Sequence, residues 1–384
     1  MNTQEWLNHL ISFDTTSRNS NLALISTVES WCQEQQLKAY VLPDETKTKA
    51  NLLATIPAVD GSTQGGLVLT GHTDVVPVDG QTWATDPFQA TALGDKVFGR
   101  GTADMKGFIA VMLALTPKFK AMKPAKPIHF SLTYDEEVGC LGAPFVVDFM
   151  RNSGLAPEAC IVGEPTNMKP VIGYKGRLMY HCQFKGLAAH SSLANQGCNA
   201  IEFASRLICY IREMADGIKK QGPFDSDFDV PYTTVTVNII SGGAATNIIP
   251  ANCDFYLEVR YLPDFSKERF SSQIENYIAQ ELLPEMQETH PAATVLFELD
   301  SNAPGFNTTM ESPIVGLVQA ITGGHELTKV SYSTEAGIFH RGGIPSIICG
   351  PGSIEQAHKP NEFVTQEQLR LCETALLNIV QSFC

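Results

Sequence analysis

Short apolar runs alternate with stretches of helical periodicity over the first half of the chain. Apolar residues recur at helical spacing within residues 3–36, from Met105 to Leu115 and from Gly142 to Met150. Apolar runs of strand length lie between them, at residues 39–42, 51–56, 66–70, 128–133 and 159–162. Buried strands that alternate with helices are typical of an α/β fold whose mostly parallel sheet is covered by helices. We predict this fold for the first half of the chain.

The pattern changes near Lys175. Polar and apolar positions now alternate, as in strands with one exposed face, at residues 177–184, 233–238 and 253–260. Helical periodicity occupies two longer stretches, residues 198–218 and 266–285. These elements predict an α+β domain inserted into the α/β fold.

Helix and strand patterns alternate again after residue 303, with helices at 313–321 and 366–380 and a strand at 346–349. A chain of 384 residues is long enough for more than one hydrophobic core. We therefore predict a discontinuous α/β domain of residues 1–175 and 304–384, and an inserted domain of residues 176–303.

Side chains that can bind a metal follow three of the predicted strands. His72 and Asp74 come after the strand at 66–70, the pair Glu136 and Glu137 comes after the strand at 128–133, and Glu164 follows the strand at 159–162. In open α/β sheets, ligands bind beyond the carboxyl ends of the strands. We expect these side chains to converge, with the Asp74 carboxylate accepting the imidazole N–H of His72 that does not face a metal.

Two further residues complete a possible set of metal ligands. Asp104 lies 32 residues after His72, between glycines, where its two oxygens could bridge two cations. His358 lies in a loop rich in glycine and proline after the strand at 346–349. Each residue taken alone also fits a structural role, such as a helix N-cap for Asp104. Together they supply what a two-metal hydrolase requires: a bridging carboxylate, and one imidazole and one carboxylate for each ion.

Glu136 and Glu137 are adjacent in an extended segment, so their side chains diverge. One can bind metal while the other holds the attacking water. Clustered carboxylates at the end of a buried strand cost stability unless cations compensate them, which favours a site over a solvated loop.

The composition narrows the classes of function. Lys and Arg number 27 and Asp and Glu number 41, a net charge of −14, which argues against binding nucleic acid. A cationic small molecule or a metal fits this charge better, although acidity also serves solubility. The ten cysteines form no C-x-x-C pair, which favours a reducing compartment. No run of about 18 apolar residues suggests a membrane span, and we expect a cytoplasmic protein.

The remaining histidines are weaker candidates for chemistry. His190 lies at a predicted transition from strand to loop in the insert, where it could donate a hydrogen bond to an oxyanion. We interpret the others as surface or core residues: His9, His129, His181, His290, His325 and His340.

With these residues assembled, the chain resembles the M20 family of metallopeptidases over nearly its full length. The stretches that carry this resemblance are residues 71–77, 99–107, 135–139, 186–192 and 350–360. The resemblance implies a zinc-peptidase-like catalytic domain and an inserted domain that forms a homodimer. It also implies two zinc ions per subunit, for which cobalt can substitute.

The resemblance implies a role for each motif residue. His72, Asp104 and Glu164 would hold one ion, and Asp104, Glu137 and His358 the other. Glu136 would be the general base, and Asp74 the carboxylate behind His72. His190 would reach the active site of the partner subunit and stabilise the oxyanion. Asn247 and Arg260 would bind the carboxylate of the substrate.

Within the family, residues 333–336 and 350–358 are similar to members that hydrolyse the acetyl amide of N2-acetyl-L-ornithine to L-ornithine and acetate, a step of arginine biosynthesis. Glu335 could pair with the terminal ammonium of such a substrate. The alternatives are a deacylase of other N-acyl amino acids, a dipeptidase or carboxypeptidase of the same family, and a non-catalytic relative that binds metal or amino acids.

Overall fold

The computed structural model describes residues 1–324 and 326–384. It divides into two compact units. The first unit contains Met1–Gly173, Asn307–Lys329 and Thr334–Cys384, and the second contains Tyr174–Phe306 and Val330–Ser333. His325, interpreted above as a surface or core residue, lies outside the described residues.

A sheet with parallel central strands forms the middle of the first unit. Its strands are β1 (Lys38–Pro43), β2 (Ala50–Ile56), β3 (Leu67–His72), β6 (Ile128–Thr133), β7 (Ala159–Pro165), β8 (Val171–Tyr174), β15 (Phe306–Asn307), β16 (Thr328–Val330) and β17 (Ser346–Gly350). Their order is β1-β2-β6-β3-β7-β17-β8-β15, and β16 pairs with β8.

The pairing of these strands explains their apolar sequences. Strand β3 is parallel to both β6 and β7, and β17 is parallel to β7, whereas β1 and β2 are antiparallel to their neighbours. Every residue of β3, β6, β7 and β17 is buried. Strands buried on both faces are continuously apolar because neither face meets water. The predicted fold class, with its mostly parallel central sheet, is confirmed.

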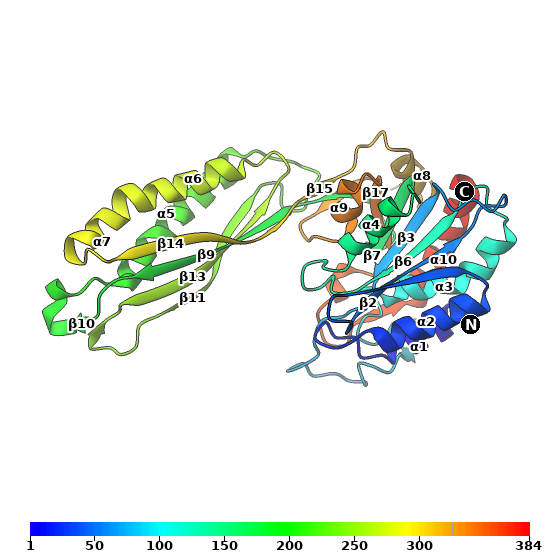
Figure 1. Cartoon of the computed structure of the whole chain (residues 1–384), viewed down its shortest axis with the longest axis horizontal. Helices are drawn as coiled ribbons and strands as arrows, with labels where there is room; N and C mark the ends of the chain where they lie inside the picture. Colours follow the sequence, from blue (N-terminus) through cyan, green and yellow to red (C-terminus); the bar gives the residue numbers. More distant parts are fainter. Residues whose placement is uncertain (325) are drawn as a thin grey trace. The chain divides into compact units, whose positions relative to one another are not determined.

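Helices cover both faces of this sheet (Figure 1). They are α1 (Thr3–Ile11), α2 (Leu22–Glu34), α3 (Lys106–Ala121), α4 (Ala143–Asn152), α8 (Pro313–Ile321), α9 (Ala336–Arg341) and α10 (Gln366–Phe383). Helices α1, α2, α3, α8 and α10 share one hydrophobic cluster with the sheet. Helices α4 and α9 pack against each other on the other face. A small sheet in the order β18-β5-β4 is formed by Thr91–Leu93 (β4), Lys96–Phe98 (β5) and Phe363–Thr365 (β18).

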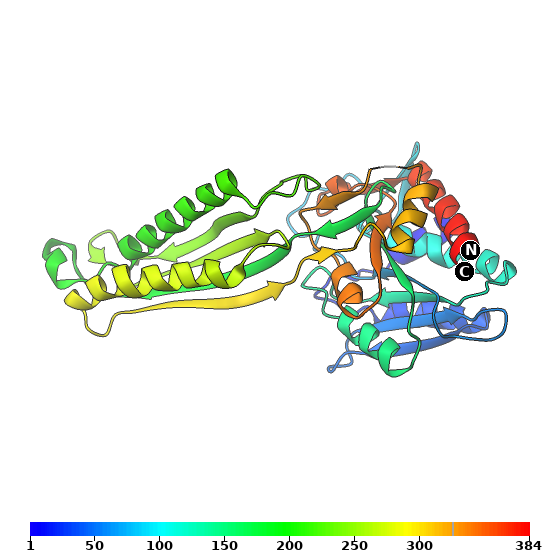
Figure 2. The ribbon, with the colours of Figure 1, turned by 90° about the horizontal axis from the view of Figure 1, so that it is seen from above.

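The second unit is an antiparallel sheet with helices on one face (Figure 2). Its strands are β9 (Gly176–Lys185), β11 (Thr234–Gly242), β13 (Asn252–Tyr261) and β14 (Thr294–Ala303), in the order β11-β13-β9-β14. The helices are α5 (Ala200–Gln221), α6 (Lys267–Tyr277) and α7 (Leu283–Thr289). Alternate residues of β9 are buried, and they join apolar residues of the helices in one cluster. One buried face accounts for the alternating sequence pattern.

Proline interrupts the helix predicted for residues 266–285. The structure has α6, a π-helical turn η2 (Ile278–Leu282) and then α7, which has Pro284 in its first turn. Proline has no N–H to continue the hydrogen-bond ladder, but it is well suited to a first turn. The periodic apolar pattern continues across this junction, so it does not indicate the break.

None of the described helices is long and apolar enough to cross a membrane. All ten cysteines lie in the described part of the chain, where none forms a disulfide and most are buried.

Candidate metal centre

The predicted ligands lie at the carboxyl ends of the central strands of the first unit. His72 is the last residue of β3, and Glu164 is the penultimate residue of β7. The other members come from loops: Asp104 just before α3, Glu136 and Glu137 after β6, and His358 between β17 and β18. Because β3, β6 and β7 are adjacent and parallel, their ends meet at one edge of the sheet.

The carboxylate of Asp104 lies between two imidazoles. Its Oδ1 atom is 3.0 Å from Nε2 of His72, and its Oδ2 atom is 3.4 Å from Nε2 of His358. The same nitrogen of His72 is 3.4 Å from Glu164 Oε1, and that of His358 is 3.0 Å from Glu137 Oε2. Each oxygen of the shared aspartate therefore faces one imidazole that is also close to one glutamate.

Two overlapping groups of side chains have donor atoms close enough to hold a metal ion. One contains His72, Glu136 and Glu164, and the other contains His72, Asp104 and Glu137, with all donor atoms within 4.8 Å of one another. Imidazole nitrogens and carboxylate oxygens are ordinary ligands of zinc. The site is therefore a candidate metal centre.

The charges of these side chains indicate what would occupy the site. Burial, followed by the negative charge of Asp104, raises the pKa of Glu164 to about 8. The same two causes raise the pKa of Glu137. Burial and the charge of Glu164 raise the pKa of Glu136 well above its ordinary value. Carboxylates so crowded favour bound cations, which would offset their repulsion, so the residues present fit divalent metal ions.

The pKa values of the two imidazoles are raised as well, which for a histidine favours the charged form. Burial opposes a charge on His72, but hydrogen bonds with Asp104 and Glu164 outweigh burial and raise its pKa well above the ordinary value. Hydrogen bonds with Asp104 and Glu137 raise the pKa of His358 to about 10. Both imidazoles therefore lie in a strongly negative environment.

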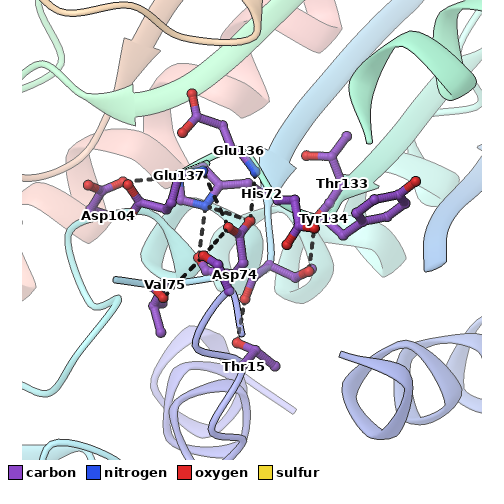
Figure 3. A network of polar contacts seen from close by, with 12 residues as sticks. Thr15, His72, Asp74, Val75, Asp104, Thr133, Tyr134, Glu136 and Glu137 are labelled. Atoms are coloured by element: carbon purple, nitrogen blue, oxygen red, sulfur yellow. Dashed lines mark hydrogen bonds and ion pairs between the residues drawn. The ribbon is translucent and has the colours of Figure 1, made fainter. Parts of the chain in front are cut away.

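Asp74 holds the segment that carries the two adjacent glutamates (Figure 3). Its Oδ1 accepts a hydrogen bond from the backbone N–H of Glu136 at 3.0 Å, and its Oδ2 accepts one from that of Glu137 at 3.3 Å. The hydroxyl of Ser17 also donates to Oδ2, at 2.7 Å. The buried carboxylate of Asp74 thus holds the backbone of the loop that follows β6.

The contact between His72 and Asp74 differs in detail from the prediction. Nδ1 of His72 lies 2.9 Å from the main-chain oxygen of Asp74 and 3.6 Å from its carboxylate Oδ1. The main-chain carbonyl therefore makes the shorter contact, because the carboxylate is directed at the backbone of the neighbouring loop. Either acceptor would leave Nε2 free to face a metal.

Sequence reasoning did not identify three groups that surround these residues. The thiol of Cys140 contacts Glu136 Oε1 at 3.3 Å, and Ser17 supports Asp74 as described. Glu362, a buried carboxylate, accepts a hydrogen bond from the backbone N–H of Asp104 at 3.1 Å. Cys140 could have been suspected, since it follows Glu136 by four residues. Ser17 lies 57 residues from Asp74, and Glu362 lies 258 residues from Asp104, so no local signal links either pair.

Glu335 is fully buried, with 0% of its surface exposed. It is the N-cap residue of α9, and its two carboxylate oxygens accept hydrogen bonds from the hydroxyls of Thr70 at 2.5 Å and Thr133 at 2.7 Å. Burial raises its pKa despite these two donors. In this conformation Glu335 anchors α9 to β3 and β6, and its pairing with a substrate ammonium stays a prediction.

The other predicted residues belong to the second unit. His190 ends the short strand β10 (Ala189–His190), which pairs with β12 (Ile248–Ile249). The backbone of Asn247 accepts a hydrogen bond from Ser191 N at 3.0 Å, so the structure brings His190 and Asn247 together. Arg260 lies on β13, where its Nε donates to Glu258 Oε1 at 3.0 Å. The role of His190 at an oxyanion, and those of Asn247 and Arg260 in binding substrate, stay predictions.

Comparison with known proteins agrees with this fold and this cluster, and defines the chain as a metal-dependent hydrolase. The chain belongs to peptidase family M20/M25/M40, whose sequence model matches residues 68–382. The predicted family and the predicted enzymatic class are thus confirmed.

Similar proteins resemble the chain over nearly its whole length. The acetylornithine deacetylase of Photorhabdus laumondii subsp. laumondii is 33% identical over 372 residues, which cover 97% of this chain and 93% of that protein. The acetylornithine deacetylase of Pasteurella multocida is 34% identical over 374 residues, which cover 97% and 94%.

Solved structures establish the shared fold. A tripeptidase of Staphylococcus aureus superposes with a TM-score of 0.76 at 20% identity, and the alignment covers 99% of this chain and 97% of that one. A dinuclear metal-binding peptidase of the M20 family from Bacillus subtilis gives a TM-score of 0.67 at 14% identity, with 99% and 98% covered.

Proposed function

We propose that the protein hydrolyses the acetyl amide of N2-acetyl-L-ornithine, giving L-ornithine and acetate, as a step of arginine biosynthesis. The observation that carries the hydrolytic chemistry is the position of Asp104 between two pairs of imidazole and glutamate. The choice of substrate is supported by the acetylornithine deacetylases that are 33% and 34% identical over nearly the whole chain.

The donor set fits two divalent cations, with zinc as the resident metal and cobalt as a substitute. His72 and Glu164 would hold one ion, and His358 and Glu137 would hold the other. Asp104 would bind both ions. When bound, such ions polarise an amide carbonyl and lower the pKa of water to near neutrality. One imidazole and one terminal carboxylate for each ion leave positions open for water and substrate.

Glu136 is the general base of this proposal. It is half-buried, lies next to the proposed ligand Glu137, and is held by the backbone contact of its N–H with Asp74. Its carboxylate would take a proton from the attacking water and pass that proton to the nitrogen of the leaving amine. The pKa raised by burial and by Glu164 suits a base that must accept a proton near neutral pH.

A panel of amides is expected to separate this function from its alternatives. The purified protein, loaded with zinc, should cleave N2-acetyl-L-ornithine faster than N-acetyl amino acids with neutral side chains and faster than dipeptides. Chelation should abolish hydrolysis, because the carboxylates alone cannot activate water, and zinc or cobalt should restore it. Release of acetate and of free amine is the measurement.

Each other result of this panel has a definite meaning. Faster cleavage of a dipeptide would assign a peptidase instead, and hydrolysis that survives chelation would refute the metal mechanism. Binding of metal without hydrolysis of any amide would indicate a non-catalytic relative. The same panel applied to Glu335→Gln checks the ammonium pairing, which is wrong if the preference for cationic side chains does not change.

The second unit is proposed to pair with a second copy of the chain. Strand β11 is at one edge of its sheet, so its outer N–H and C=O groups are available to another strand. Ile239 and Ile240 on this strand are 60% and 53% exposed. Large apolar side chains on a free edge are typical of an interface.

Charge placed on this edge is expected to separate the two copies. The double variant Ile239→Lys/Ile240→Lys should be monomeric at concentrations where the wild type is a dimer, because charged side chains oppose edge-to-edge pairing. Analytical ultracentrifugation measures the mass. Val59→Lys, which replaces a 67% exposed residue of the first unit, is the matched control and should remain dimeric. A monomeric wild type, or a dimeric double variant, would contradict this pairing.

A further inference from the structure

Glu362 is a carboxylate that no proposed step of the reaction uses, yet all of its acceptor positions are occupied. Its side chain is 0% exposed. Its Oε1 accepts hydrogen bonds from the backbone N–H groups of Ala103 at 2.9 Å and Asp104 at 3.1 Å. Its Oε2 accepts from the N–H of Gly101 at 2.9 Å and from Nη1 of Arg100 at 2.7 Å. Four hydrogen bonds to one buried carboxylate connect Glu362 rigidly to residues 100–104.

These contacts fix the backbone immediately before and at Asp104. The main-chain oxygen of Glu362 also accepts the N–H of Gly99 at 3.0 Å, so one residue binds the loop at both ends. Gly101 has a φ of 86°, and an added Cβ would lie 2.8 Å from Val75. The loop therefore relies on a conformation that glycine permits and that the carboxylate of Glu362 stabilises.

Arg100 extends the connection to the loop of His358. Its guanidinium is buried, lies over the ring of Trp83, and donates through Nη2 to Gln81 Oε1 at 2.8 Å. Gln81 in turn donates through Nε2 to the main-chain oxygen of His358 at 3.0 Å. His358 has a φ of 62°, a left-handed conformation that costs energy for a residue other than glycine. The hydrogen bond from Gln81 helps to hold the backbone of His358 in this conformation.

We propose that Glu362 is a positioning residue, which fixes the loop of Asp104 directly and the loop of His358 through Arg100 and Gln81. The inference rests on the proposed two-metal site. Asp104 and His358 are 254 residues apart in sequence (358 − 104) and must meet within a few ångströms. Because Glu362 supports both loops, it sets the separation of the Asp104 and His358 side chains before any ion binds. Ligands that are already in position bind metal more tightly.

The test measures the affinity of the metal-free protein for zinc, in competition with a chromophoric chelator. Glu362→Gln should lower the affinity at both sites about 10- to 100-fold, the usual effect of residues that support metal ligands. Gln81→Ala should weaken only one of the two binding steps, because it supports His358 and not Asp104. Glu367→Gln replaces an exposed carboxylate on α10 that pairs with Arg370, and it should bind zinc as the wild type does.

A second variant separates positioning from simple destabilisation. Glu362→Gln leaves the buried Arg100 without its counter-charge, which by itself destabilises a fold. Glu362→Gln/Arg100→Met removes that unpaired charge and should recover stability of the metal-free protein against urea, while its affinity for zinc stays low. Recovery of both stability and zinc affinity would overturn the positioning role.

The outcomes also distinguish this inference from the proposed function. A wild type that binds no zinc would refute the metal site and the inference together. A wild type that binds two ions, with Glu362→Gln binding them equally well, would refute only the role of Glu362.

Discussion

Replacement of Glu136 by alanine is expected to leave metal binding intact and to lower kcat at least about 10²-fold, the lower range for loss of a general base. None of the short contacts that join Asp104 to the two imidazoles involves Glu136. Its loop is held by backbone N–H groups that donate to Asp74, and these remain in an alanine variant. The loss should therefore fall on proton transfer. Steady-state kinetics with N2-acetyl-L-ornithine and metal analysis of the same sample measure the two effects.

The adjacent residue supplies a matched comparison. Glu137→Ala removes a carboxylate whose Oε2 is 3.0 Å from Nε2 of His358, and it should weaken binding of one ion. Glu136→Gln, which keeps the size of the side chain but cannot accept a proton at the same position, should behave like Glu136→Ala. Near-normal turnover of either Glu136 variant would refute the assignment of the base. Loss of metal in Glu136→Ala would instead show that Glu136 is a ligand. This is geometrically possible, because its donor atoms lie close to those of His72 and Glu164.

The fold could be predicted where burial alone determines the sequence pattern. The runs at residues 66–70, 128–133 and 159–162 became β3, β6 and β7, whose residues are all buried. Helices connect these strands along the chain, and strands joined by a helical crossover run parallel, so their parallel direction could be predicted as well. Apolar periodicity could not indicate the π-helical turn at residues 278–282, because the pattern continues through it; Pro284 is the one sequence signal of the interruption.

The site could be predicted as a set of side chains but not as a network. His72, Glu136 and Glu164 each lie at or just after the end of a strand, and the shared edge of a parallel sheet brings them together. The contacts that hold them come from distant segments: Ser17 meets Asp74 across 57 residues, and Glu362 meets the N–H of Asp104 across 258. Such contacts depend on the paths of loops that are far apart in sequence, and the local pattern of apolar residues does not indicate these paths.

Replacement of Asp104 by asparagine is expected to remove both ions and nearly all activity. Oδ1 of Asp104 lies 3.0 Å from the imidazole of His72, and Oδ2 lies 3.4 Å from that of His358, so one side chain is shared by both halves of the site. Asparagine keeps the size but loses the charge and replaces one oxygen with a nitrogen that cannot bind a cation. A metal contributes several kcal/mol to catalysis, and each 1.36 kcal/mol is tenfold in rate. We expect kcat/KM to fall at least about 10³-fold.

The fold of the Asp104→Asn variant should survive, which makes the loss of metal interpretable. Burial and the charge of Asp104 together raise the pKa of Glu164 to about 8, so a neutral residue at 104 relieves that repulsion in the metal-free protein. The imidazoles of His72 and His358 lose one carboxylate partner, but each still contacts a glutamate. The backbone N–H of residue 104 can still donate to Glu362. Zinc should raise the melting temperature of the wild type, because a ligand that binds the folded state stabilises it, and should leave that of the variant unchanged. Glu164→Gln is the matched control, since it removes a carboxylate from only one half and should retain one ion. Two ions bound to Asp104→Asn with the affinity of the wild type would show that the two halves do not depend on a shared carboxylate.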